Sequence, residues 1–156
     1  MTTAISGPLP ASDIAVPLRS DEDVLRRIDL LVDQDARQWR SIWLLFVSAS
    51  GVQLPVVVPI DGVPQYPDLT TARSLCWVIA EALRSNVPGG HAVVVLTRPG
   101  AGPADDADRD WATTLHRAAG DRGASIRMVC LATPAGVCRL GATAPGEHEP
   151  GTGRRL

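Results

Sequence analysis

A short, uninterrupted run of aliphatic residues at positions 92–96 is the feature that most limits what this chain can fold into. The run reads Ala-Val-Val-Val-Leu, follows Pro-Gly-Gly at 88–90 and precedes a Gly/Pro-rich segment at 98–103. A short apolar run between turn-forming residues is typical of a strand that is buried on both faces. Such a strand needs a covering layer on each side, and in an α/β protein those layers are helices. We therefore expect a central strand in an α/β fold.

A second apolar region predicts a β-hairpin. Residues 42–47 and 52–60 are rich in β-branched and aromatic residues and flank the small polar segment 48–51. Both arms are apolar at successive positions, so both of their faces should be covered. Pro55 and Pro59 cannot donate ladder hydrogen bonds, which places the second arm at a sheet edge or at a bulge.

The first helix is expected to begin after Ser20. This residue is a predicted N-cap, and the three acids that follow it suit the positive end of a helix dipole. Apolar residues then recur at helical spacing, which predicts a helix to about Arg37, with Arg27 among the residues that face solvent.

Two more helices and a closing hairpin complete the pattern. One helix is predicted over 69–86, and another begins at the acid-rich segment 105–110 and is closed by Gly120 and Gly123. Residues 126–140 predict a hairpin around a Thr-Pro-Ala-Gly turn. The expected order is α-β-β-α-β-α-β-β, in a mixed sheet with helices on both faces.

The length of 156 residues corresponds to one ordinary domain. We place that single α/β domain at residues 20–140. Residues 1–19 are expected to be mostly flexible and residues 141–156 disordered, because both segments are poor in large apolar side chains.

Composition excludes several classes of function. The net charge of −2 gives no general attraction to phosphate backbones or anionic lipid, which argues against nucleic acid and membrane surfaces as partners. All 15 basic residues are Arg, as in the proteins of a GC-rich bacterium, so lysine Schiff-base chemistry is absent. The sequence shows neither a long apolar span nor a secretory signal, which predicts a cytoplasmic protein. Cys76, Cys130 and Cys138 lack C-x-x-C spacing, and we expect reduced core cysteines.

Two segments invite a functional interpretation. Asp106, Asp108 and Asp110 alternate as in a calcium loop, but the Gly and the bidentate Glu of such a loop are missing, so capping of a helix explains these acids better. The 98–103 loop resembles a phosphate cradle only in its glycines, since neither of the usual nucleotide-binding motifs is present. The three histidines have no metal-ligand spacing.

The stretch from residue 41 to about residue 140 resembles the JAB/MPN metalloprotease-like family, particularly its RadC-like branch. In that family a hairpin and a helix lead into an apolar strand that ends in H-x-H-P. A Gly/Pro loop follows, and S-x-x-D then opens a helix that leads to a further strand. The apolar run 93–96 and the loop 98–103 occupy the corresponding places here.

The catalytic residues that the resemblance implies are absent. The two metal-binding histidines of the family fall on Leu96 and Arg98, its serine on Asp106 and its metal-binding aspartate on Arg109. Only Pro99 is retained. A zinc site needs three protein ligands, so the resemblance implies a degenerate domain that has lost its enzyme activity and binds no metal or other cofactor.

The sequence leaves three hypotheses about function. The first is a non-catalytic cytoplasmic binding or scaffold domain with a JAB/RadC-like fold, which acts through a protein partner or through self-association. The second is a small-molecule or nucleotide-binding domain that uses the 98–103 loop. The third is a metal-dependent hydrolase with an unrecognised site among Asp105, Asp106, Asp108 and Asp110.

A candidate interaction surface lies on the helix 69–86. Trp77 sits at the margin of the apolar stripe of this helix, with Arg73 and Arg84 on the same flank. The simpler interpretation is that the N-terminal helix covers this tryptophan. The alternative is that Trp77 anchors a partner surface, where Trp and Arg are enriched.

Overall fold

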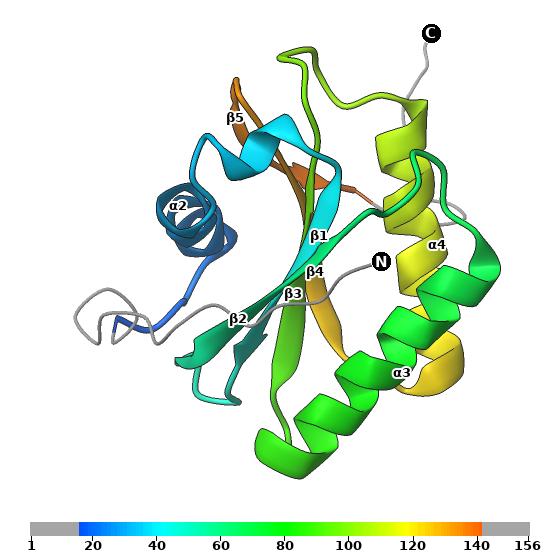
Figure 1. Ribbon diagram of the computed structural model, residues 1–156. Coiled ribbons are helices and arrows are strands. Elements are labelled where there is room, and N and C mark those ends of the chain that lie inside the picture. The colour runs from blue at the N-terminus through cyan, green and yellow to red at the C-terminus, as the bar shows by residue number, and fades with distance from the viewer. Residues whose placement is uncertain (1–15, 142–156) are drawn as a thin grey trace, which may run out of the picture.

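A five-stranded mixed sheet forms the middle layer of the computed structural model, which describes residues 16–141 (Figure 1). The segments 1–15 and 142–156, expected to be flexible and disordered, lie outside the described residues. The elements are α2 (Asp21–Leu31), the 3-10 helix η1 (Ala36–Gln38), β1 (Ser41–Val47), β2 (Gln53–Asp61), α3 (Leu69–Asn86), β3 (His91–Thr97), α4 (Asp106–Arg122), β4 (Ile126–Thr133) and β5 (Gly136–Leu140). The predicted α/β domain with a mixed sheet is confirmed.

The strand order in the sheet is β2-β1-β3-β4-β5. β1 pairs antiparallel with both β2 and β3, β3 pairs parallel with β4, and β4 pairs antiparallel with β5. The apolar run 92–96 therefore lies in the central strand, as predicted. The strand with Pro55 and Pro59 lies at an edge, and its register with β1 shifts between Leu45 and Val47, so the edge prediction is also confirmed.

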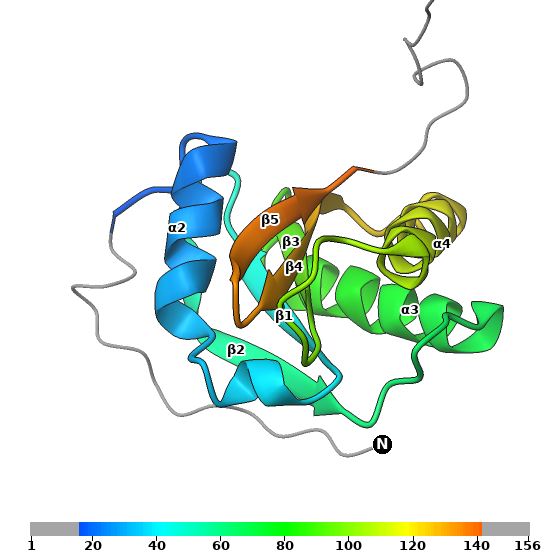
Figure 2. The ribbon, with the colours of Figure 1, turned by 90° about the horizontal axis from the view of Figure 1, so that it is seen from above.

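Helices cover both faces of this sheet, α2 on one side and α3 with α4 on the other (Figures 1 and 2). Successive residues of a strand point to opposite faces. In β3, Ala92, Val94 and Leu96 pack in the α3/α4 layer, whereas Val93 and Val95 pack with α2. This alternation explains why the run is apolar at every position.

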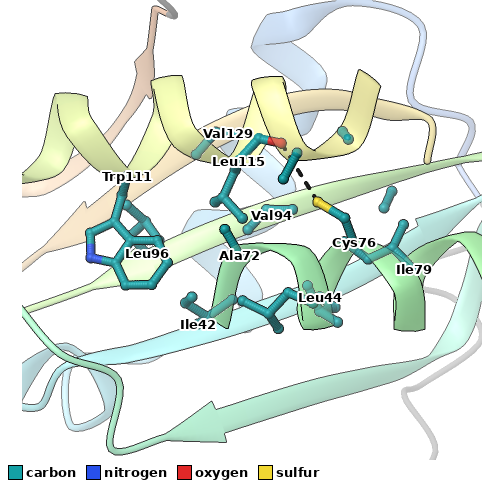
Figure 3. Close-up of a cluster of buried hydrophobic side chains, with 14 of the residues drawn as sticks. Ile42, Leu44, Ala72, Cys76, Ile79, Val94, Leu96, Trp111, Leu115 and Val129 are labelled. Atoms are coloured by element: carbon teal, nitrogen blue, oxygen red, sulfur yellow. Dashed lines mark hydrogen bonds between the residues drawn. The ribbon is translucent and has the colours of Figure 1, made fainter. Parts of the chain in front are cut away.

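Side chains of the two helices and of the sheet form the core beneath α3 and α4 (Figure 3). Ala72 and Cys76 of α3 and Trp111 and Leu115 of α4 lie over the aliphatic residues of β1 and β3. The thiol of Cys76 donates to the carbonyl of Leu115 at 3.6 Å, which joins the two helices.

Each of the three α-helices within residues 16–141 begins at a capping side chain. Ser20 and Asp105 each accept from the backbone N–H three residues later, and Asp23 and Asp108 reach back to complete two capping boxes. Asp68 caps α3 through the N–H of Thr71 at 2.7 Å. The capping interpretation of the acidic segment at 105–110 is thus confirmed for Asp105 and Asp108.

The first helix is shorter than predicted. α2 ends at Leu31 instead of near Arg37, because Val32 adopts an extended backbone and the chain turns back. Arg37 is then buried, and its guanidinium donates to the carbonyls of Val32 (2.9 Å), Thr133 (3.2 Å) and Asp29 (3.3 Å). A buried arginine that binds the last carbonyls of a helix stabilises an early end to that helix.

Three other residues differ from expectation. Arg27 is buried instead of facing solvent, and its Nη1 donates to Oε1 of Gln53 at 2.7 Å. Leu18, placed in a segment expected to be mostly flexible, is buried and bonds to the carbonyl of Gly51 at 2.8 Å. Cys76 and Cys130 are core cysteines, but Cys138 on the edge strand β5 is exposed. None of the helices within residues 16–141 has the length and apolar composition to span a membrane.

Candidate functional site

The residues at the degenerate motif positions lie at the end of β3 and the start of α4. Leu96 points into the core, Arg98 follows the last residue of β3, and Pro99 is exposed in the loop. Asp106 is the first residue of α4 and Arg109 lies in its first turn. The fold therefore brings these positions together at one end of the sheet.

A buried ion pair occupies this end of the sheet. Nε of Arg98 lies 3.1 and 3.0 Å from the two carboxylate oxygens of Asp108, and Nη2 lies 2.8 Å from Oδ2. Arg98 is 6% exposed and Asp108 is 3% exposed. Hydrogen bonding to the Asp108 carboxylate raises the pKa of Arg98, so the guanidinium stays charged.

The Gly/Pro loop is wrapped around the same guanidinium. Nη1 of Arg98 donates to the carbonyls of Pro99 and Gly100, both at 3.3 Å. Nη2 donates to the carbonyls of Gly102 (3.3 Å) and Pro103 (2.9 Å). Four carbonyls of the loop thus point toward Arg98, and the loop gains its shape from an internal cation.

Three of the four aspartates of the 105–110 segment, Asp105, Asp106 and Asp108, are also bound to neighbours. The carboxylate of Asp108 accepts the N–H of Asp105 at 2.9 Å, in addition to its bonds from Arg98. The pKa of Asp105 is lowered, mainly because the carboxylate accepts the N–H of Asp108. Asp106 pairs with Arg109 at 3.0 Å on the surface. Within residues 16–141 there is no group of three His, Cys, Asp or Glu side chains that could hold a metal ion.

A second polar cluster at this end of the sheet was not found by sequence reasoning. Oγ of Ser41 lies 2.5 Å from Oγ1 of Thr97, and Thr97 donates to the carbonyl of Trp39 at 2.8 Å. The indole N–H of Trp43 donates to Ser41 at 3.1 Å. Because Thr97 uses its proton on Trp39, the Ser41 hydroxyl donates to Thr97. The only signal is the pairing of β1 with β3, which places Ser41 opposite Thr97.

The predicted interaction surface lies on the outer side of α3. Trp77 is 54% exposed and Arg73 and Arg84 are also exposed, with Arg84 paired to Glu81. The helix α2 lies on the opposite face of the sheet (Figure 1). The interpretation that the N-terminal helix covers Trp77 is therefore wrong, because that helix packs against the odd-numbered residues of β1 and β3.

An apolar groove runs between α3 and the edge of the sheet. Its volume is about 370 Å³. The two walls come from one side of α3 and from the α3-facing side of β1 and β2. The lining residues are Leu44, Phe46, Val58, Ile60, Thr70, Thr71, Ser74, Leu75, Val78 and Ala82.

Sequence reasoning missed this groove. The apolar runs that contain Leu44 and Ile60 predict strands covered on both faces. The apolar stripe of the helix 69–86 predicts only the side of that helix that packs on the core. The missed signal is that two helices, α3 and α4, must cover one face of a five-stranded sheet, which leaves part of β2 uncovered.

Comparison of this chain with models of known families, with curated proteins and with solved structures gives no match. Its function is therefore argued from its own residues and geometry.

Proposed function

We propose that this chain is a non-catalytic, cytoplasmic binding or scaffold domain with a JAB/RadC-like fold. The observation that carries the proposal is the buried pair of Arg98 and Asp108, at the place where the resemblance locates a metal centre. The succession of hairpin, helix, strand, loop, helix and strand between residues 41 and 140 supports the fold assignment.

The pair supports a non-catalytic role for two reasons. A guanidinium beside Asp108 repels a divalent cation and takes the carboxylate oxygens that a metal would need. Leu96, at the place of the first family histidine, is buried in the core and offers no donor atom. The polar groups of this region therefore stabilise the fold instead of serving a substrate.

The outer side of α3 supports the binding part of the proposal. Trp77 is more than half exposed in the middle of a long helix, with the exposed Arg73 and Arg84 on the same flank. Trp and Arg are the residue types enriched at the energetic centres of protein interfaces. Trp77 with Arg73 and Arg84 is thus the surface that we assign to partner contact.

The test is a direct search for the chemistry that the proposal excludes. The purified chain should contain no stoichiometric zinc after mild dialysis, and it should cleave neither peptide nor isopeptide bonds. A thermal-shift screen with nucleotides and divalent metals should leave the melting temperature unchanged, because a ligand at 100 times its Kd adds about 2.7 kcal/mol to the free energy of unfolding. One zinc per chain, or a concentration-dependent rise in the melting temperature with a nucleotide or a divalent metal, would overturn the proposal.

A further inference from the structure

We propose that the groove between α3 and β2 is the contact surface of a homodimer, in which the Trp77 indole of each copy enters the groove of the other. This inference rests on the proposed binding function and names the partner as a second copy of this chain. It is carried by the groove, by the exposed indole on the same helix and by the chemistry of the sheet edge.

The groove selects an uncharged occupant. No ionisable side chain is among its lining residues. Its polar groups are hydroxyls, and that of Thr71 already donates to Asp68 at 2.8 Å. Small-molecule sites combine an apolar cavity with a few converging polar groups. The hydroxyls of this groove, from Thr70, Thr71 and Ser74, all belong to the α3 wall, and the sheet wall is apolar, so no polar groups converge on a ligand from both walls. A large apolar side chain of a protein fits this chemistry best.

The chain itself carries such a side chain. Trp77 does not line its own groove, since Val78 forms the wall and successive helical residues lie about 100° apart. The indole therefore stands on the crest of α3, exposed and beside the groove. A surface that presents both a protruding indole and an uncharged hollow can bind a copy of itself through two equivalent contacts.

The sheet edge disfavours the usual alternative, in which two β2 strands pair and extend the sheet. Pro55 and Pro59 lie in this edge strand and have no N–H to donate. Prolines at an edge strand oppose strand addition. The contact is therefore expected between side chains of α3 and the groove, not between backbones.

The available area limits the strength of the dimer. α3 has 18 residues, so the strip it forms with β2 is about 27 Å long and about 15 Å wide. Its projected area is on the order of 400 Å², below the roughly 800 Å² that each partner gives to a standard interface. We therefore expect a weak, reversible dimer.

Sedimentation equilibrium across about 1 to 300 µM tests the proposal. The unmodified chain should shift from monomer to dimer with concentration. W77A, which removes the indole, and S74F, which fills the groove from an exposed position, should each raise the Kd at least about tenfold. W39A is the matched control, because Trp39 is 65% exposed but lies outside the helix and groove. Unchanged melting temperatures would establish that the variants fold.

A mixture of variants tests the indole-in-groove contact itself. W77A keeps an open groove and S74F keeps its indole, so the mixed pair retains one contact while neither variant retains any with itself. Unlabelled S74F added to ¹⁵N-labelled W77A should shift the amide signals of groove residues such as Val58 and Val78, and unlabelled W77A should not. Absence of these shifts, a monomeric chain at 300 µM, or equal weakening by W39A would overturn the dimer. These outcomes leave the non-catalytic role intact, since that role fails only on zinc, hydrolysis or ligand binding.

Discussion

Arg98 and Asp108 form a buried, doubly hydrogen-bonded ion pair that ties the end of the central strand to the first turn of α4. The same arginine holds four loop carbonyls, and the same aspartate holds the N–H of Asp105. The pair thus fixes the strand end, the loop and the helix start as one unit.

Removal of one partner should destabilise the fold strongly. R98A leaves a buried carboxylate and four carbonyls without their donor, and D108A leaves a buried guanidinium without its counter-charge. Each should lower the free energy of unfolding by about 3 to 5 kcal/mol, as measured by urea denaturation. R109A, which removes an exposed pair with Asp106, should cost less than about 1 kcal/mol.

The double variant R98M/D108L distinguishes the ion pair from the other hydrogen bonds that the two side chains make. Because it removes both charges, it should lose less stability than the sum of the single variants R98M and D108L, with a coupling free energy above about 1 kcal/mol. Strict additivity would mean that the loop carbonyls, not the ion pair, account for the role of Arg98.

Regular elements of this fold could be predicted because local spacing determines them. The run 92–96, the two prolines of β2 and the capping residues before α2 and α4 are each required locally by a strand, a sheet edge or a helix start. The early end of α2 could not be predicted, since it depends on Arg37 reaching a carbonyl of Thr133. That contact joins residues 96 positions apart.

The sequence predicts which residues lie in the candidate site but not the contacts between them. From sequence, Arg98 is a lost motif position and Asp108 is a helix-capping acid. Their separation of ten residues gives no sign that their side chains form a hydrogen bond. The exposure of Trp77 depends on which face α2 covers, which helical spacing alone does not decide. The groove between α3 and β2 likewise arises only because the strand order leaves part of β2 uncovered.

Two glycines offer a matched pair of substitutions. A Cβ at Gly90 would lie 2.4 Å from the carbonyl oxygen of Val47 and 2.5 Å from Cγ1 of Val87, whereas a Cβ at Gly120 in α4 meets nothing within 4 Å. G90A should therefore cost about 2 to 3 kcal/mol of stability through overpacking. G120A should add about 0.5 to 1 kcal/mol through helix propensity. Chemical denaturation of both variants measures the contrast, and equal effects would contradict it.

Two half-buried histidines should make stability fall in mild acid. Burial lowers the pKa of His91 and of His116, and Arg127 and Arg139 lower them further by charge repulsion. Between the unfolded value near 6.5 and the lower folded values the unfolded chain binds more protons, so stability rises with pH. The stability that the two neutral histidines contribute is fully present above pH 6.5. It is lost as the pH falls toward their pKa values in the folded chain.

The variant H91Q/H116Q tests this pH dependence. Its melting temperature should vary less between pH 5 and 7 than that of the unmodified chain. The lowered carboxylate pKa values of Asp23, Asp68 and Asp105 act only below about pH 4 and leave this window unaffected. Parallel pH profiles of the two proteins would contradict the assignment.

The three thiols should react in two classes. Burial raises the pKa of all three thiols, to about 11 for Cys76 and about 12 for Cys130, but Cys138 is exposed to reagents whereas Cys76 and Cys130 are buried. Since the thiolate is the reactive form, a disulfide reagent at pH 8 should modify one thiol per native chain and three after denaturation. C138S should abolish the native reaction and leave two thiols in the denatured chain. Rapid modification of a second thiol in the native protein would show that the core around Cys76 or Cys130 opens readily.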